Sequence, residues 1–470
     1  MKTLFIKPLF TASVISLALS ACNLAPKYEQ PQIQLPSTTF QHDTAQGQVQ
    51  FQAAKLGWQD YFADPRLHQL IELALKNNTD LRTAALNAEQ VRATYAITRS
   101  ALLPNLGAEA GAKRAGSSQA IGESYNVGLG VTGFELDLWG RVRNSSQAAL
   151  QNYFAVQANR DAAQLSLIAS VAKAHFAEIH AQNAMQLAQR VLASREETHR
   201  LSQLRHKAGV ISALQLHQQT ALIEQAKSSY AVAVQAKEQA RNALQLLISD
   251  KLPENLPEPL PLNQQFTIRH LPAGLSSDLL LNRPDIIAAE HTLKQHNANI
   301  GAARAAFFPR ISLTGSLGLN SSQLDNLFQS ANKVWSFGGG LSLPIFDFGA
   351  NSARLESAKI EQQKAIVAYE AAVESAFRDV ANALTARASL SSQYQSDTAQ
   401  SKAYNETLRL THLRHKYGIA STLDLLEAER SSYNAANTLL TTERTLADNL
   451  ADLYKVLGGG LKRHTSETQH

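Results

Sequence analysis

The chain of 470 residues has one cysteine, Cys22, and no apolar run of the length that a membrane-spanning helix needs. A single cysteine excludes an internal disulfide and a metal site built from several thiolates. Because a spanning helix takes about 18 or more apolar residues, any membrane crossing would have to be made by β-strands. Nucleophile motifs, phosphate-binding loops and zinc-hydrolase motifs are also missing, so we expect neither an enzyme nor a bound cofactor.

Glycine and proline are missing from two long stretches, residues 141–208 and 350–417, and from a shorter stretch after each. These stretches are rich in Ala, Gln, Leu, Glu and Arg, which favour helix. At about 1.5 Å per residue, a helix of about 68 residues reaches roughly 100 Å. A globular domain needs no helix of that length, whereas a rod or tube across a wide gap does.

A strong charge of one sign is missing as well. The formal net charge is +5 and falls to +3 if a leader that carries Lys2 and Lys7 is removed. This near-neutral balance does not predict nucleic-acid binding. His412 and His415 lie three residues apart on an expected helix, but no acidic or cysteine partner completes a metal site, so we predict no metal.

The first residues read as a leader. A basic start and a short apolar run end in Leu19-Ser20-Ala21-Cys22. This resembles the lipobox of bacterial lipoproteins, in which the cysteine becomes the first residue and carries lipid. We expect a signal peptide over residues 1–21 and lipid on Cys22; the alternative is a chance cysteine after an ordinary signal peptide. Asn23 stands where an aspartate commonly signals inner-membrane retention, which favours the outer membrane.

The two halves of the chain repeat each other. Residues 80–104 align with residues 285–309 at an offset of 205, and the segment ending at Gly209 aligns with the segment ending at Gly418 at an offset of 209. The pattern indicates an internal duplication with a unit of about 205 residues. The expected segments are an N-terminal lipid-anchored part (22–75), a first repeat (76–249), a proline-rich connector (250–284), a second repeat (285–457) and a tail (458–470).

Alternating apolar and polar residues predict two strands in each repeat, over about 105–137 and about 310–346. Runs of about ten residues suit tilted transmembrane strands with one face to lipid and one to water. The phase of the alternation shifts near Gly133, which predicts a bulge. A soluble β-sandwich fragment is the alternative. Four strands cannot close a barrel, whose smallest common form has about eight, so the chain must form an oligomer. Two copies or three remain open.

Each repeat should then contain a helical hairpin, over 140–208 and 212–249 in the first and 350–417 and 421–457 in the second. Basic residues in the last turn of each long helix suit the helix dipole, and a glycine after it suits a left-handed stop. A serine then begins the next helix, with Gln215 or Asp424 three residues on as a capping box requires. These tip residues either only build the turn or present two basic tips to a partner's helices. They are Arg205, Lys207, Gly209 and Ser212, and Arg414, Lys416, Gly418 and Ser421.

Four local motifs, together with the lipobox and the duplication, resemble the outer-membrane factors of tripartite efflux systems, and most of all the lipoprotein branch that serves resistance–nodulation–division multidrug pumps. The motifs are ELDLWGR at 135–141, LLLNRPDI at 279–286, AARAAFFP at 302–309 and LPIFDFG at 343–349. The resemblance covers essentially the whole chain after the leader.

This resemblance implies an α+β membrane protein: a homotrimer whose twelve-stranded transmembrane β-barrel, four strands per chain, continues into a long periplasmic α-helical barrel with a mixed equatorial domain. It also implies a passive exit duct in the outer membrane, extending through the periplasm. The implied partners are a periplasmic adaptor protein, an inner-membrane proton-driven pump and outer-membrane lipid.

In the family, rings of side chains on the last helix pair narrow the periplasmic end. Those positions fall here on Leu423, Glu427 and Arg430, which share one helix face. Glu427 stands where close relatives often have aspartate, and Asp424 either adds a second acidic ring or only caps its helix. The first repeat has Gln215, Gln218 and Ala221 at the positions of Asp424, Glu427 and Arg430. We therefore expect the second hairpin to be the one that opens.

Three alternatives remain. The same duct could carry metal ions or secreted protein of the type I route. A periplasmic coiled-coil scaffold lipoprotein would explain the helices but not the strands or the lipobox. An outer-membrane lipoprotein enzyme is disfavoured because no catalytic constellation is found.

Overall fold

The computed structural model describes residues 23–31, 33, 56–117, 121–267 and 282–465. The leader and Cys22 lie outside the described residues. The chain divides into two compact units, and each takes segments from both repeats. The first, the sheet unit, comprises residues 1–33, 86–158 and 287–372, and the second, the hairpin unit, comprises residues 34–85, 159–286 and 373–470. In the described part of the chain, no helix combines the length and the apolar character that a membrane span requires.

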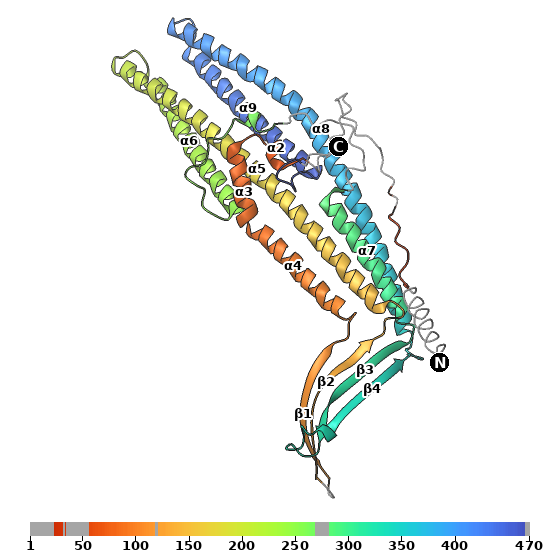
Figure 1. Cartoon of the computed structure of the whole chain (residues 1–470). Coiled ribbons are helices and arrows are strands. Elements are labelled where there is room, and N and C mark those ends of the chain that lie inside the picture. Colours follow the sequence, from red (N-terminus) through yellow and green to blue (C-terminus); the bar gives the residue numbers. More distant parts are fainter. Residues whose placement is uncertain (1–22, 32, 34–55, 118–120, 268–281, 466–470) are drawn as a thin grey trace. The chain divides into compact units, whose positions relative to one another are not determined.

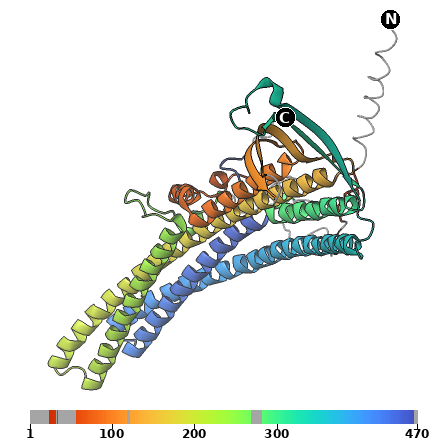
Figure 2. The same ribbon diagram turned by 90° about the horizontal axis from the view of Figure 1, so that it is seen from below.

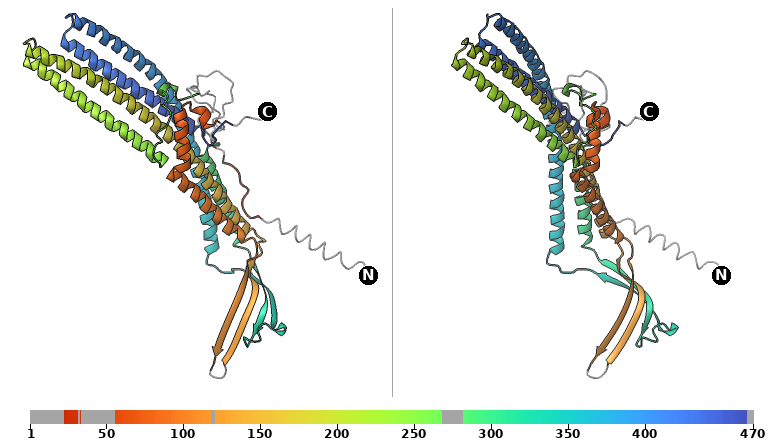
Figure 3. Two further views of the ribbon diagram at one scale, coloured as in Figure 1. Left: turned by 60° about the vertical axis from the view of Figure 1, so that its left-hand side comes forward. Right: turned by 90° about the vertical axis from the view of Figure 1, so that its left-hand side faces the viewer.

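The sheet unit contains four antiparallel strands in chain order (Figure 1). They are β1 (Leu106–Gly116), β2 (Ile121–Glu135), β3 (Arg310–Ser321) and β4 (Lys333–Ser342), the last preceded by the short η4 (Ser330–Asn332). The strands β2 and β3 come from different repeats and form the centre of the sheet, which curves along its length (Figure 3). Strands β1 and β4 are the edges.

Two features of β2 follow from its glycines. The pairing of β2 with β3 shifts between Val131 and Phe134, and Gly133 there has a φ of +67°. The bulge predicted near Gly133 is therefore confirmed. Further along, Gly128 faces Gly318. A Cβ on Gly318 would lie 2.4 Å from the Val127 carbonyl oxygen, so the two central strands approach more closely than a side chain would allow.

Residues 23–31 run beside α7 (Pro284–Ala305) within the sheet unit. Asn297 Nδ2 donates to the Pro26 carbonyl oxygen at 2.8 Å, and Arg304 Nη1 donates to the Leu24 carbonyl oxygen at 3.0 Å. Tyr28 donates its hydroxyl to Glu290 at 3.1 Å, and the Lys294 ammonium lies over the Tyr28 ring. Side chains of α7 thus hold residues 24–28 along the helix.

The long helices form two antiparallel hairpins (Figures 1 and 2). Helices α5 (Arg141–Lys207) and α8 (Ala350–Lys416) both have 67 residues. Their shorter partners are α6 (Ala213–Ile248) and α9 (Thr422–Val456). All eight ends of these helices lie within a residue or two of the predicted bounds. Glycines with positive φ follow α5, α8 and α9, whereas α6 ends at Ser249, which has a φ of +54°.

Part of the core of the hairpin unit lies where the N-terminal segment packs against α9. Here α2 (Trp58–Tyr61) brings Tyr61 against Tyr454 of α9, with ring centroids 4.2 Å apart. Both hydroxyls donate to buried carbonyl oxygens: Tyr61 to Leu450 at 2.8 Å and Tyr454 to Leu56 at 2.6 Å. Two large rings are thus buried with their polar ends satisfied.

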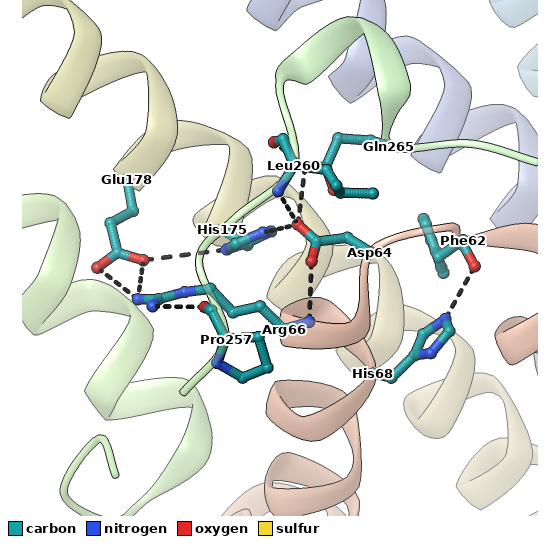
Figure 4. A network of polar contacts seen from close by, with 9 residues as sticks. All are labelled: Phe62, Asp64, Arg66, His68, His175, Glu178, Pro257, Leu260 and Gln265. Atoms are coloured by element: carbon teal, nitrogen blue, oxygen red, sulfur yellow. Dashed lines mark hydrogen bonds and ion pairs between the residues drawn. The ribbon is translucent and has the colours of Figure 1, made fainter. Parts of the chain in front are cut away.

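A buried carboxylate joins three segments beside this core (Figure 4). Asp64 is inaccessible to solvent and accepts from the Arg66 amide, the Gln265 side chain and the Leu260 amide. Its Oδ2 also lies 2.9 Å from Nε2 of the equally buried His175. Burial raises the pKa of Asp64, but the hydrogen bonds from His175, Gln265 and Arg66 outweigh that effect and hold the pKa below its ordinary value. Asp64 therefore ties α5 to the proline-rich connector as a charged acceptor.

Asp64 also begins α3 (Pro65–Asn77). This helix lies in the N-terminal segment and was not predicted from the sequence. The Asp64 carboxylate caps the helix and Pro65 occupies the first helical turn. Both are standard helix-start signals, and they could have revealed α3. After Asn78 the chain continues as α4 (Thr79–Ser100), which is the first helix of the first repeat. In the connector, the described residues contain only the short η2 (Leu262–Gln264).

Candidate functional site

The two hairpin tips are built by the same turn. Gly209 and Gly418 have φ of +73° and +74°. The Val210 amide donates to the Arg205 carbonyl oxygen and the Ile419 amide to the Arg414 carbonyl oxygen, both at 2.8 Å. These are the closing bonds of a left-handed helix stop, as the glycines predicted.

Each following helix begins with a complete capping box. In the first hairpin, Ser212 and Gln215 exchange side-chain to backbone hydrogen bonds at 3.1 and 3.3 Å. In the second, Ser421 and Asp424 do the same at 2.9 and 3.1 Å, and the Ser421 hydroxyl donates to the Asp424 carboxylate at 2.8 Å. The hydrogen bonds from the backbone and side chain of Ser421 lower the pKa of Asp424. Asp424 thus caps α9 as a carboxylate.

The basic tip residues are exposed. Arg205, Lys207, Arg414 and Lys416 all face solvent, and none of them forms an ion pair within the described residues. The same tips expose apolar side chains that the sequence analysis did not single out: Val210, Leu214, Tyr417 and Ile419. A surface that combines unpaired cations with exposed apolar groups suits an amphipathic protein partner.

The predicted gate residues lie on α9 just beyond the second tip. The Leu423 side chain is 75% exposed. Glu427, one helical turn on, pairs with Arg430 at 2.7 Å. The hydrogen bond from Arg430 lowers the pKa of Glu427, so the carboxylate is charged at neutral pH. The pair is open to solvent and contributes little to stability, which leaves both side chains available for other contacts.

A groove between α8 and α9 adjoins the gate residues. Three of the predicted gate residues, Leu423, Asp424 and Glu427, line this groove. Three residues of α8 that were not predicted line it as well. The lining residues are Tyr404, Thr407, Thr411, Leu423, Asp424, Glu427, Ala428 and Ser431. The spacing of the three α8 residues, three and then four, places them on one face of that helix and was a signal available in the sequence.

Comparison with known proteins gives three findings. The model of the outer membrane efflux protein family matches residues 70–249 and 275–459. The chain is 37% identical over 473 residues to the toluene efflux pump outer membrane protein TtgC of Pseudomonas putida, covering 98% of this chain and 97% of that protein. It is 36% identical over 452 residues to the cation efflux system protein CusC of Escherichia coli, covering 95% and 98%.

Among solved structures, the chain is similar to the open state of the Neisseria gonorrhoeae MtrE outer membrane channel. The TM-score is 0.89 and the sequence identity 55%, over 95% of this chain and all of that chain. The likeness therefore extends over both units and both hairpins.

Asp424 offers a test of what the second acidic position does. Asp424→Gln reproduces the first hairpin and should keep the capping box. Of the two capping-box hydrogen bonds, Asp424→Ala should lose only the one from the Ser421 amide to the side chain of residue 424, at a cost of about 1 kcal/mol in local helix stability. Hydrogen exchange of the amides at 421–425 measures the difference. Equal exchange in Asp424→Ala and the unaltered chain would contradict the capping role.

Proposed function

Because this chain belongs to the outer membrane efflux protein family and is an outer-membrane exit duct of an efflux pump, we propose that it passively conducts drugs and other toxic compounds to the exterior. The predicted fold, a trimeric channel with four strands per chain that continue into a helical barrel, is confirmed by the solved channels it matches. The cargo arrives from a periplasmic adaptor and a proton-driven inner-membrane pump, and the duct itself performs no catalysis.

The observation that carries the proposal is the shared face of Leu423 and Glu427 beside the second tip. Both side chains are exposed in the single chain and lie one helical turn apart on α9. In a trimer the face repeats three times, giving an apolar ring next to an acidic ring. The three carboxylates of the acidic ring repel one another and repel anions, and the three leucines of the apolar ring exclude water from the duct. Together the rings narrow the resting duct, and docking of the adaptor at the tips widens it.

The lipid on Cys22 is part of the same proposal. Arg304, which holds Leu24, lies six positions before the first residue of β3. Residue 23 is thus held at the strand-bearing end of α7, where a lipid on Cys22 would reach the outer membrane. Mass spectrometry of the N-terminal peptide should find a diacylglycerol-modified, N-acylated Cys22. An unmodified Cys22 would contradict the proposed lipid anchor.

The gate has an internal control. Leu423→Ala with Glu427→Ala should raise the single-channel conductance of the purified trimer several-fold, because both rings lose their bulk. Leu214 and Gln218 occupy the same positions in the first hairpin. Leu214→Ala with Gln218→Ala should leave the conductance near that of the unaltered trimer. Equal effects of the two pairs would place the constriction elsewhere.

Cargo and docking can be tested in one strain that lacks the gene. The unaltered chain should restore resistance to hydrophobic drugs. A chain with Arg205→Glu, Lys207→Glu, Arg414→Glu and Lys416→Glu should restore much less and should co-purify less adaptor, because the reversed tips repel the surface that the basic tips attract.

Two outcomes would revise these assignments. TtgC and CusC are almost equally similar to this chain, yet their names specify toluene and cations. Restored resistance to metal ions alone would replace the drug cargo with cations. If the chain with reversed tip charges restores full drug resistance and co-purifies as much adaptor as the unaltered chain, the basic residues have no role in docking.

A further inference from the structure

The two faces of the four-stranded sheet differ in chemistry. Residues that lie directly opposite each other in an antiparallel pair share a face of the sheet. One row across β2, β3 and β4 consists of Leu129, Leu317 and Trp335. The adjacent row, on the other face, consists of Gly130, Ser316 and Ser336. In a transmembrane barrel the apolar face meets lipid and the polar face lines the duct.

Two basic residues lie on the apolar face. Lys333 begins β4, and its row across the sheet consists of Ala110, Val127, Leu319 and Lys333. Arg114 lies four positions beyond Ala110 in β1. Because alternate residues of a strand share a face, Arg114 and Lys333 both point to the lipid side.

Both cations lie at the end of the sheet that is remote from the helices. Eight positions separate Leu106 from Arg114 in β1, and eight separate Leu341 from Lys333 in β4. Eight residues rise roughly 27 Å along a strand, which is about 20 Å along the membrane normal at a tilt of about 40°. The apolar band of such a barrel is about 25 Å tall. The two cations therefore lie where hydrocarbon gives way to the headgroups of the outer leaflet.

The chain leaves these cations largely without anionic partners. Arg114 pairs with Glu123 at 3.3 Å, but its side chain is still 70% exposed. Lys333 is exposed and forms no ion pair in the described part of the sheet unit, not even with Asp325 of the loop before it. A cation at the margin of the hydrocarbon gains from an anion at the same depth, and lipid headgroups supply one.

The two cations come together only between copies. Strands β1 and β4 are the edges of the sheet (Figure 1), so in the trimeric channel β4 of one copy lies beside β1 of the next. These strands run antiparallel, which places their outer ends side by side. Lys333 and the partner subunit's Arg114 thus flank one seam on the lipid face. A single chain holds only half of this arrangement.

We propose that each seam between copies binds the phosphate of an outer-leaflet glycolipid between Lys333 and the partner subunit's Arg114. The guanidinium suits two phosphate oxygens at once, and the ammonium adds a point charge. The acyl chains lie along the apolar rows, with Trp335 next to the headgroup. Lipid A, a disaccharide that carries phosphates and several acyl chains, has this chemistry.

The bound lipid has a structural consequence. Because it contacts two copies, it strengthens the seam where the edge strands meet. Its site lies in the sheet unit, whereas the gate residues and the basic tips belong to the hairpin unit. Lipid binding is therefore a property separate from the conduction of cargo and from docking of the adaptor.

The chemistry of the lipid is tested with the unaltered trimer in a neutral detergent. Fluorescent lipid A with both phosphates should bind, as measured by anisotropy. The same lipid stripped of its phosphates should bind roughly twentyfold more weakly, because each contact of a cation with an anionic headgroup is worth about fivefold. Inorganic phosphate in excess should not displace the lipid, since it has no acyl chains.

Variants on the two faces of one strand test the location. Arg114→Gln combined with Lys333→Gln should weaken binding of the phosphorylated lipid by roughly twentyfold. Lys113→Gln is the matched control, because it removes the same charge from the next residue of β1, which lies on the face that lines the duct. It should leave lipid binding unchanged. Arg114→Lys with Lys333→Arg keeps both charges and should keep the binding.

The outcomes are distinct. Equal binding of the two lipids by the unaltered trimer would overturn the proposal, even if the double variant fails to assemble. Displacement by inorganic phosphate would overturn the lipid as the ligand. Full binding by an assembled double variant, or equal weakening by Lys113→Gln, would overturn the site. A trimer that binds the lipid but conducts nothing would overturn the proposed function and leave the lipid site standing.

Discussion

The open edges of the four-stranded sheet are the constraint on which the rest depends. Among the residues that the structure describes, β1 pairs only with β2 and β4 only with β3, so each outer edge carries a row of backbone groups without a strand partner. Neither lipid nor a single chain can satisfy them. Edge-to-edge pairing between copies does, and it makes a closed ring. Once the copies form a ring, each exposed side chain of α9 is repeated around one axis.

The duplication shows that one turn accepts different residues at the same position. Ser212 with Gln215 and Ser421 with Asp424 form equivalent capping boxes, so folding tolerates either an amide or a carboxylate at that position. The carboxylate of Asp424 is therefore an addition to a turn that closes without it.

Much of the fold could be predicted because its determinants are local. Glycine ends the long helices, serine begins their partners, and alternation marks the strands, each within a few residues of the feature it specifies. The bulge at Gly133 and both capping boxes were predictable for that reason. The start of α3 at Asp64 and Pro65 is specified just as locally, although both residues fall within the segment predicted only as a lipid-anchored N-terminal part.

The sequence by itself determined which segments are helix or strand and where each begins and ends, because those choices depend on backbone dihedrals and on neighbours one turn away. Only the tertiary structure decided that Asp64 meets His175 and Gln265, which are 111 and 201 residues distant, and that Arg195 faces Glu429. Such pairs depend on how two helices or a helix and a connector lie side by side. No periodicity along the chain encodes which distant residues form such a pair, because the pairing is set by the packing of surfaces that meet only when the chain folds.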